Sequence, residues 1–109
     1  MTERLTAEAA LELAAASEDG RYGVLLRNGT MELGFYIPDG VDPQQPHDQD
    51  EIYVVQSGSG TFVIGGGRRP FSQGEALFVP AGAAHRFENF SDDFAAWVVF
   101  YGPSGGETE

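Results

Sequence analysis

Histidine is scarce in this chain, and both histidines stand in settings that suit metal binding. They are His47 and His85, among 109 residues. His47 lies two residues after Gln45 and four before Glu51, so an extended chain would project these three side chains from one face. If His85 lies on an inward face of the same β structure, two imidazoles and a carboxylate converge. Such a set suits a divalent cation that keeps positions open for water or substrate.

The second histidine opens a short strand behind a tight turn. Residues 74–89 read GEALFVPAGAAHRFEN, which predicts an apolar strand, a turn at Pro80–Ala81–Gly82 and a second strand from His85. Proline presets its own φ, and Gly82 can take the positive φ that a type II turn requires. The imidazole then shares a face with Phe87. A histidine on an apolar face is commonly a hydrogen-bonded core residue, and for His85 alone that interpretation stays open.

The helical signal of the chain is confined to residues 5–16. Thr6 is a plausible N-cap, and alanines dominate the segment. The apolar stripe formed by Leu5, Ala9 and Leu13 is thin. We therefore expect this helix on the outside of the domain or against a partner subunit.

After the helix the hydrophobic period changes to two, which is the period of strands. Asn28–Gly29 predicts a hairpin, and short strands with turns about every 8–12 residues predict an all-β sandwich or barrel. We expect a helical extension over 1–20, a β-barrel over 21–103 and a flexible tail over 104–109. A chain of 109 residues is long enough for one core and too short for two.

The turn and strand around His85 carry a family resemblance. The pattern Gly74-x5-Pro80-x-Gly82-x2-His85-x3-Asn89 is similar to the second conserved motif of the cupin superfamily at every specified position. The resemblance implies a small single-domain protein of the cupin 2 type. Its fold would be the double-stranded β-helix, or cupin jelly-roll barrel, with the short helix added at its N-terminus.

The segment around His47 resembles the first cupin motif in part. It reads Gln45-x-His47-x3-Glu51-x6-Gly58, and Gln45 stands where metal-binding cupins usually carry the first histidine. The resemblance implies that His47, Glu51 and His85 are metal ligands. Gln45 would either coordinate through its amide oxygen or bind a metal-held water.

A metal in such a site supports two classes of chemistry, and the sequence leaves both open. As a Lewis acid it would serve an isomerase, epimerase, lyase or cyclase reaction, and as a redox centre it would serve a dioxygenase. The expected cofactor is one divalent transition metal, with Fe or Mn favoured and Zn, Ni or Cu as alternatives. Candidate pocket residues are Tyr36, Tyr53 and Trp97. A non-catalytic metal- or metabolite-binding module is the alternative, and a barrel whose site has decayed ranks third.

Charge and composition limit the classes of molecule that this chain is expected to bind. The chain carries 17 acidic and 6 basic side chains, for a formal charge of −11, and such a chain repels nucleic acid and anionic membrane surfaces. It has no cysteine, which excludes disulfides and thiolate ligands and fits a reducing compartment. We expect a cytoplasmic protein with a small-molecule substrate. We also expect a homodimer, because pairing covers exposed strand edges.

Overall fold

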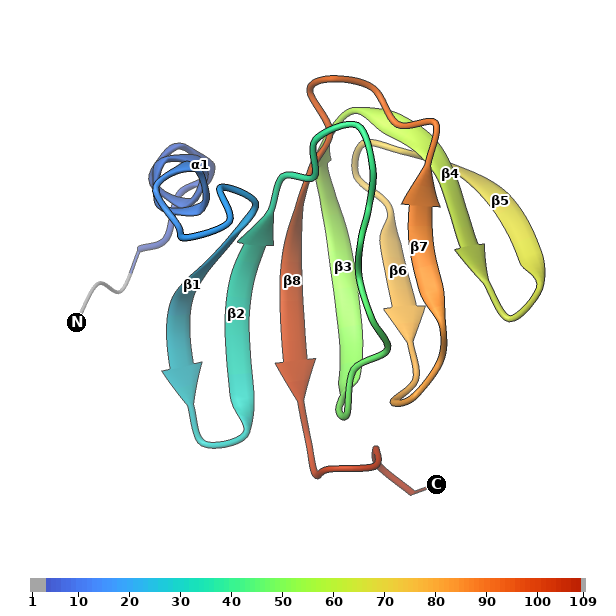
Figure 1. Cartoon of the computed structure of the whole chain (residues 1–109). Coiled ribbons are helices and arrows are strands. Elements are labelled where there is room, and N and C mark those ends of the chain that lie inside the picture. Colours follow the sequence, from blue (N-terminus) through green and yellow to red (C-terminus); the bar gives the residue numbers. More distant parts are fainter. Residues whose placement is uncertain (1–3, 109) are drawn as a thin grey trace.

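Eight strands follow one short helix in residues 4–108, the part of the chain that the computed structural model describes (Figure 1). The elements are α1 (Ala7–Ala15), β1 (Tyr22–Asn28), β2 (Met31–Tyr36), β3 (Asp50–Ser57), β4 (Ser59–Ile64), β5 (Gly67–Ser72), β6 (Ala76–Val79), β7 (His85–Glu88) and β8 (Ala95–Tyr101). The expected hairpin forms, since Asn28 pairs with Met31 across the Asn-Gly turn. None of the described helices combines the length and apolar content that crossing a membrane requires.

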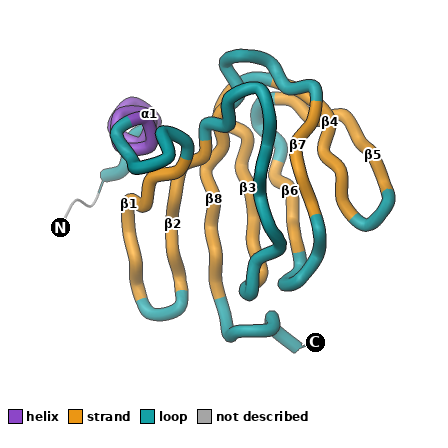
Figure 2. Tube along the Cα trace, in the orientation of Figure 1, coloured by secondary structure: helices purple, strands orange, loops and turns teal. Residues whose placement is uncertain are grey.

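The strands form two antiparallel sheets that face each other (Figure 2). One sheet has the order β1-β2-β8-β3-β6 and the other β5-β4-β7. The chain crosses between the sheets after β3, β5, β6 and β7, as in a jelly roll, while the long connection from β2 to β3 stays within the larger sheet. The predicted all-β class and cupin jelly-roll architecture are confirmed.

Aromatic side chains fill the space between the two sheets. Phe87 of β7 packs at 4.7 Å from Phe94 and 5.1 Å from Phe62, measured between ring centroids. Tyr53 of β3 reaches across to Phe87, at 4.9 Å. Strand β3 alternates, so Glu51, Tyr53 and Val55 point into this core while Ile52 and Val54 point outward. The alternation explains how a carboxylate comes to lie inside the domain.

The helix α1 packs on the outer side of β1 and β2, as expected, but with a different face. Thr6 caps it by accepting a hydrogen bond from the Ala9 amide at 3.2 Å. The buried residues are Ala10 and Ala14, whereas Leu13 of the predicted stripe is 43% exposed. The reason lies in β1, where a Cβ on Gly23 would stand 2.9 Å from the backbone nitrogen of Ala14. Two small residues and a glycine allow a close approach that leucine would prevent.

The outer face of the large sheet is apolar beyond the helix. Cross-strand pairing aligns two rows of uncharged residues over β2, β8, β3 and β6. The rows are Leu33–Val99–Ile52–Phe78 and Phe35–Trp97–Val54–Ala76. Phe78 is 52% exposed and Val54 is 38% exposed. Phe35 is 1% exposed because it packs against Ala10 and Ala14 of α1, and we call the other seven residues the apolar outer face.

The segment expected as a flexible tail is held against the start of β3. The Gly105 amide donates to the Asp48 carbonyl at 2.7 Å, and the Glu107 amide donates to Asp50 Oδ2 at 2.8 Å. Ser104 also hydrogen-bonds the Asp48 carboxylate. Residues 104–108 are therefore tied down by contacts far away in sequence, and Glu109 lies outside the described residues.

Candidate metal centre

Three segments bring His47, Glu51 and His85 together. Glu51 points inward from β3, His85 is the first residue of β7, and His47 lies in the loop that leads into β3. One potential ligand atom from each lies within 4.8 Å of the others. The turn before β7 is joined to the loop, because the Gly82 amide donates to the His47 carbonyl at 2.7 Å. Gly82 takes the expected positive φ, of 81°.

The ring orientation of His85 presents a lone pair to the centre. Its Nδ1 lies 2.9 Å from the Ala83 carbonyl, which can only accept, so we assign the ring hydrogen to Nδ1. Its Nε2 then carries a lone pair and lies 3.4 Å from Glu51 Oε1. The Tyr53 hydroxyl is 3.0 Å from the same nitrogen.

A neighbouring glutamine takes the hydrogen of that hydroxyl. Gln44 donates through Nε2 to Asp42 Oδ2 at 2.8 Å, which turns its Oε1 toward the centre. Tyr53 donates to this oxygen at 2.6 Å, a shorter contact than the one to His85. His47 Nε2 lies 3.2 Å from it as well. Because Tyr53 has one hydroxyl hydrogen, His85 Nε2 is left without a donor.

Glu51 has no donor either. Its side chain is 0% exposed, and neither carboxylate oxygen has a hydrogen-bond partner among the described residues. Burial raises the pKa of the Glu51 carboxyl from its ordinary 4.5 to about 7, while the nearby Tyr53 hydroxyl acts in the opposite direction. An unpartnered buried carboxylate is costly unless a cation joins it.

These observations together fit a divalent metal. Burial, and to a lesser extent the neighbouring His85, lower the pKa of His47, which favours the neutral imidazole that metals bind. The His85 lone pair then faces the Glu51 carboxylate with no hydrogen between them, and a ligand atom of His47 lies within 4.8 Å of both. Two imidazoles and one carboxylate are the donor set of mononuclear sites with open positions.

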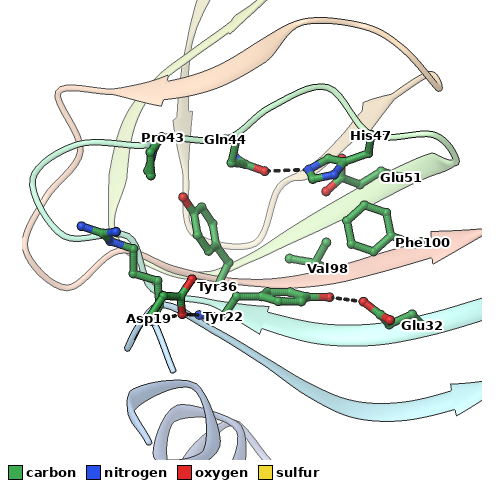
Figure 3. A pocket seen from close by; sticks show the side chains of 11 residues that line it. Asp19, Tyr22, Glu32, Tyr36, Pro43, Gln44, His47, Glu51, Val98 and Phe100 are labelled. Atoms are coloured by element: carbon green, nitrogen blue, oxygen red, sulfur yellow. Dashed lines mark hydrogen bonds between the residues drawn. The ribbon is translucent and has the colours of Figure 1, made fainter. Parts of the chain in front are cut away.

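A pocket with a volume of about 380 Å³ opens beside His47 and Glu51, which belong to its lining (Figure 3). Phe100 and Val98 form an apolar wall, and two tyrosines supply hydroxyl groups. Tyr22 donates to Glu32 at 2.8 Å, and Tyr36 donates to the buried carboxylate of Asp42. Burial, followed by these hydrogen bonds, raises the pKa of both tyrosines, so both hydroxyls stay protonated.

Most of the residues predicted from sequence meet in this region, and two do not. Tyr36 lines the pocket and Tyr53 contacts His85. Gln45 is exposed, and its neighbour Gln44 takes the place beside His47. Trp97 points to the other side of β8, where it packs 5.0 Å from Phe35 and donates to Gln56.

Sequence reasoning missed several groups around the pocket. Asp42 accepts hydrogen bonds from Tyr36, from the Gln44 side chain and from the Phe87 amide, and so ties the loop to β2 and β7. Arg21 and Tyr22 contribute from the start of β1. None of them belongs to a spaced motif, and they come together through the pairing of the sheets.

Comparisons with known proteins agree with the fold. A model of the cupin domain matches residues 34–101. The chain is 40% identical over 95 residues to an uncharacterized protein of Streptomyces coelicolor, covering 85% of this chain and 90% of that one. A Cupin 2 conserved barrel domain protein from Salinispora arenicola superimposes with a TM-score of 0.68 at 27% identity, over 94% of this chain and 89% of the other. A stretch of 55 residues, 50% of this chain, is 33% identical to 20% of the HTH-type transcriptional activator RhaS of Mannheimia succiniciproducens.

Proposed function

The chain belongs to the cupin domain family, and on that premise we propose that it is a metal-dependent enzyme that moves a proton on a small organic metabolite. His47, Glu51 and His85 would hold one divalent cation, and the adjoining pocket would hold the substrate. The observation that carries the proposal is the buried Glu51 carboxylate, which faces two imidazoles without a hydrogen-bond donor. Gln45 is left out of the ligand set because its side chain is exposed.

When bound, the metal supplies Lewis-acid polarisation of a substrate carbonyl or enediol oxygen. The protein's own contribution to proton movement is the pair Tyr36 and Asp42, in which the pocket-lining tyrosine donates its hydroxyl hydrogen to a buried carboxylate behind it. The Tyr36 oxygen can take a proton from the substrate while its own hydrogen passes to Asp42. Asp42 is fixed for this role by the donors from Gln44 and Phe87. This pair favours isomerase or lyase chemistry over oxygen chemistry.

The pocket wall favours a small substrate held away from bulk water. Phe100 lies 4.8 Å from the His47 ring, and Val98 lies beside it on the same inward face of β8. An apolar wall strengthens the electrostatic interactions at the polar end of the pocket, because it lowers the local dielectric.

Metal content tests the first half of the proposal. Elemental mass spectrometry would compare the native protein with folded His47→Ala and Glu51→Ala variants after reconstitution. We expect near-stoichiometric metal in the native protein and its loss in both variants. Native protein that takes up no metal, or variants that retain it fully, would remove the proposal.

Proton movement tests the second half without knowledge of the product. Metal-loaded protein in D2O would be offered a panel of 2-oxo acids, hydroxyaldehydes and ketoses, with solvent deuterium uptake followed by proton NMR. We expect uptake into at least one probe, reduced about 100-fold or more in Tyr36→Phe at unchanged metal content. Uptake that survives in Tyr36→Phe would remove this residue from the chemistry. Oxygen consumption by an iron-loaded sample would favour the dioxygenase alternative.

A sensing role is the second candidate, and the match to part of RhaS is the observation that favours it. In that case the same site would bind a metabolite without turnover. Metal-loaded protein that binds a probe tightly and exchanges no deuterium would support this role over the enzyme.

A further inference from the structure

Arg21 is the charged group of the pocket whose donors are not engaged. In this chain all six basic residues are arginines, against 17 acidic residues, so a basic side chain has many carboxylates to pair with. Arg27, Arg68 and Arg86 do form ion pairs. Arg21 is half-buried and lines the pocket, yet its guanidinium forms no ion pair with any described residue.

Hydrogen bonds hold both the amide and the carbonyl of Arg21. Its amide donates to Asp19 Oδ1 at 2.9 Å, and its carbonyl accepts from the Ile37 amide at 2.8 Å. Its charge also acts on Tyr36, where it works against the burial that raises the pKa of that hydroxyl. Arg21 and the tyrosine proposed to move a proton also line the same pocket.

Apart from Glu51, the acidic groups around the pocket accept hydrogen bonds from other residues. Asp19 Oδ1 accepts from Ser17, from the Arg21 amide and from the Tyr22 amide. Glu32 is shared between Tyr22 and Arg27, with contacts of 2.8 and 2.9 Å. Asp42 is buried and saturated with donors, as described above. These carboxylates have their own partners, and Arg21 does not.

We infer that the pocket takes a small carboxylate, whose carboxylate group pairs with Arg21 while a second polar group faces His47, Glu51 and His85. A guanidinium presents two parallel N–H groups that match a carboxylate, which makes it a selective partner for that group. The inference rests on the proposed function for the position of the reacting end. It adds the chemical class of the substrate, an organic acid that also carries a carbonyl, hydroxyl or second carboxylate oxygen.

The test uses ligands that differ in one carboxylate. Malonate, succinate and glutarate would each be titrated by calorimetry against the corresponding half-amide, with the metal-loaded protein. We expect at least one dicarboxylate to bind about tenfold or more tightly than its half-amide. Arg21→Gln should abolish that preference, and Arg21→Lys should keep part of it, because lysine retains the charge without the planar fork.

Arg69→Gln is the matched control. Arg69 lies on β5 in the other sheet, is exposed and forms no ion pair with a described residue, so its loss changes the net charge equally. The preference should survive in this variant. No preference in the native protein, or an equal preference in Arg21→Gln, would overturn the inference.

Metal content measured on the same samples separates the two proposals. Samples that hold metal but show no carboxylate preference leave the proposed function standing and refute the role of Arg21. Samples that take up no metal refute the proposed function. In those samples the native protein, Arg21→Gln and Arg69→Gln still report whether a carboxylate pairs with Arg21.

Discussion

Removing the charge of Glu51 should stabilise the metal-free protein, although it removes a proposed ligand. The substitution Glu51→Gln keeps the shape of the side chain and leaves it neutral. In the native protein burial raises the pKa of Glu51 from 4.5 to about 7. That difference, at about 1.4 kcal/mol for each pH unit, corresponds to an upper limit of about 3 kcal/mol in the free energy of unfolding. The whole stability of a domain is about 5–15 kcal/mol, so the effect is measurable.

The direction of the pH dependence follows from the raised pKa. The folded protein holds the Glu51 proton more tightly than the unfolded chain does, so this contribution to stability is complete below pH 4.5 and is lost as the pH rises through about 7. The neutral side chain of Glu51→Gln does not titrate, so the variant keeps this contribution to stability at every pH. The variant should match the native protein at acid pH and exceed it increasingly between pH 5 and pH 8. Other carboxylates titrate in both proteins, and their effects cancel in the difference.

Urea unfolding at pH 5 and pH 8 in the presence of a chelator measures this difference. Glu18→Gln, which removes an exposed carboxylate, is the control and should change little. With saturating metal the order should reverse, because a ligand that binds the folded state stabilises it. Equal stability of Glu51→Gln and the native protein at pH 8 without metal would refute the picture of Glu51 as an uncompensated buried charge.

Three further predictions test neighbouring parts of the structure. Gly58→Ala should lower the free energy of unfolding by about 3 kcal/mol, because φ is 86° and a Cβ would lie 2.6 Å from the Phe94 backbone. The control Gly29→Ala, with φ of 61° and nothing within 4 Å, should lower it by about 1 kcal/mol, and equal losses in thermal unfolding would contradict this. Gln44→Leu should weaken metal binding about 10–100-fold, because the Tyr53 hydroxyl then loses its acceptor and can donate to His85 Nε2 instead. Competition with a fluorescent chelator measures the affinity, and an unchanged value would contradict the proposed role of Gln44 in directing the Tyr53 hydrogen. We propose that a second copy of the chain covers the apolar outer face, because a chain of charge −11 can self-associate most easily where no ionisable side chain stands. Light scattering should find a dimer that Phe78→Glu converts to a monomer, and a monomeric native protein would refute this.

Much of the fold could be predicted because its signals are local. Asn28–Gly29 marks a hairpin by backbone conformation alone, and Gly82 takes the positive φ that its turn requires. The period of two indicates the strands, and the spacing of residues from Gly74 to Asn89 is sufficient by itself to indicate the family. The predicted buried face of α1 was wrong, because that face is set by the close approach of Gly23, which the helical pattern does not contain.

The pocket was less predictable because it depends on which face of a strand or loop each side chain occupies, and on contacts between residues far apart in the sequence. The inclusion of Gln45 assumed an extended chain up to Glu51, whereas the chain before β3 is an irregular loop that turns Gln44 inward. Trp97 stands in a strand that is apolar on both faces, so alternation cannot say which side meets the pocket. Arg21 carries no local sign of its role, which arises from its surroundings.

Two polar groups that lack partners support the proposal that this site is in use rather than decayed. Among the described residues the two oxygens of Glu51 are the buried side-chain polar atoms without a partner. A site without a function has no physical reason to keep such a carboxylate, since replacement by a neutral residue would stabilise the fold. Arg21 presents the complementary deficiency, a cation without an anion in an acidic protein. A metal ion at Glu51 and a carboxylate ligand at Arg21 would satisfy both, and because both groups adjoin one pocket, a single metal-bound organic acid accounts for the two deficiencies together.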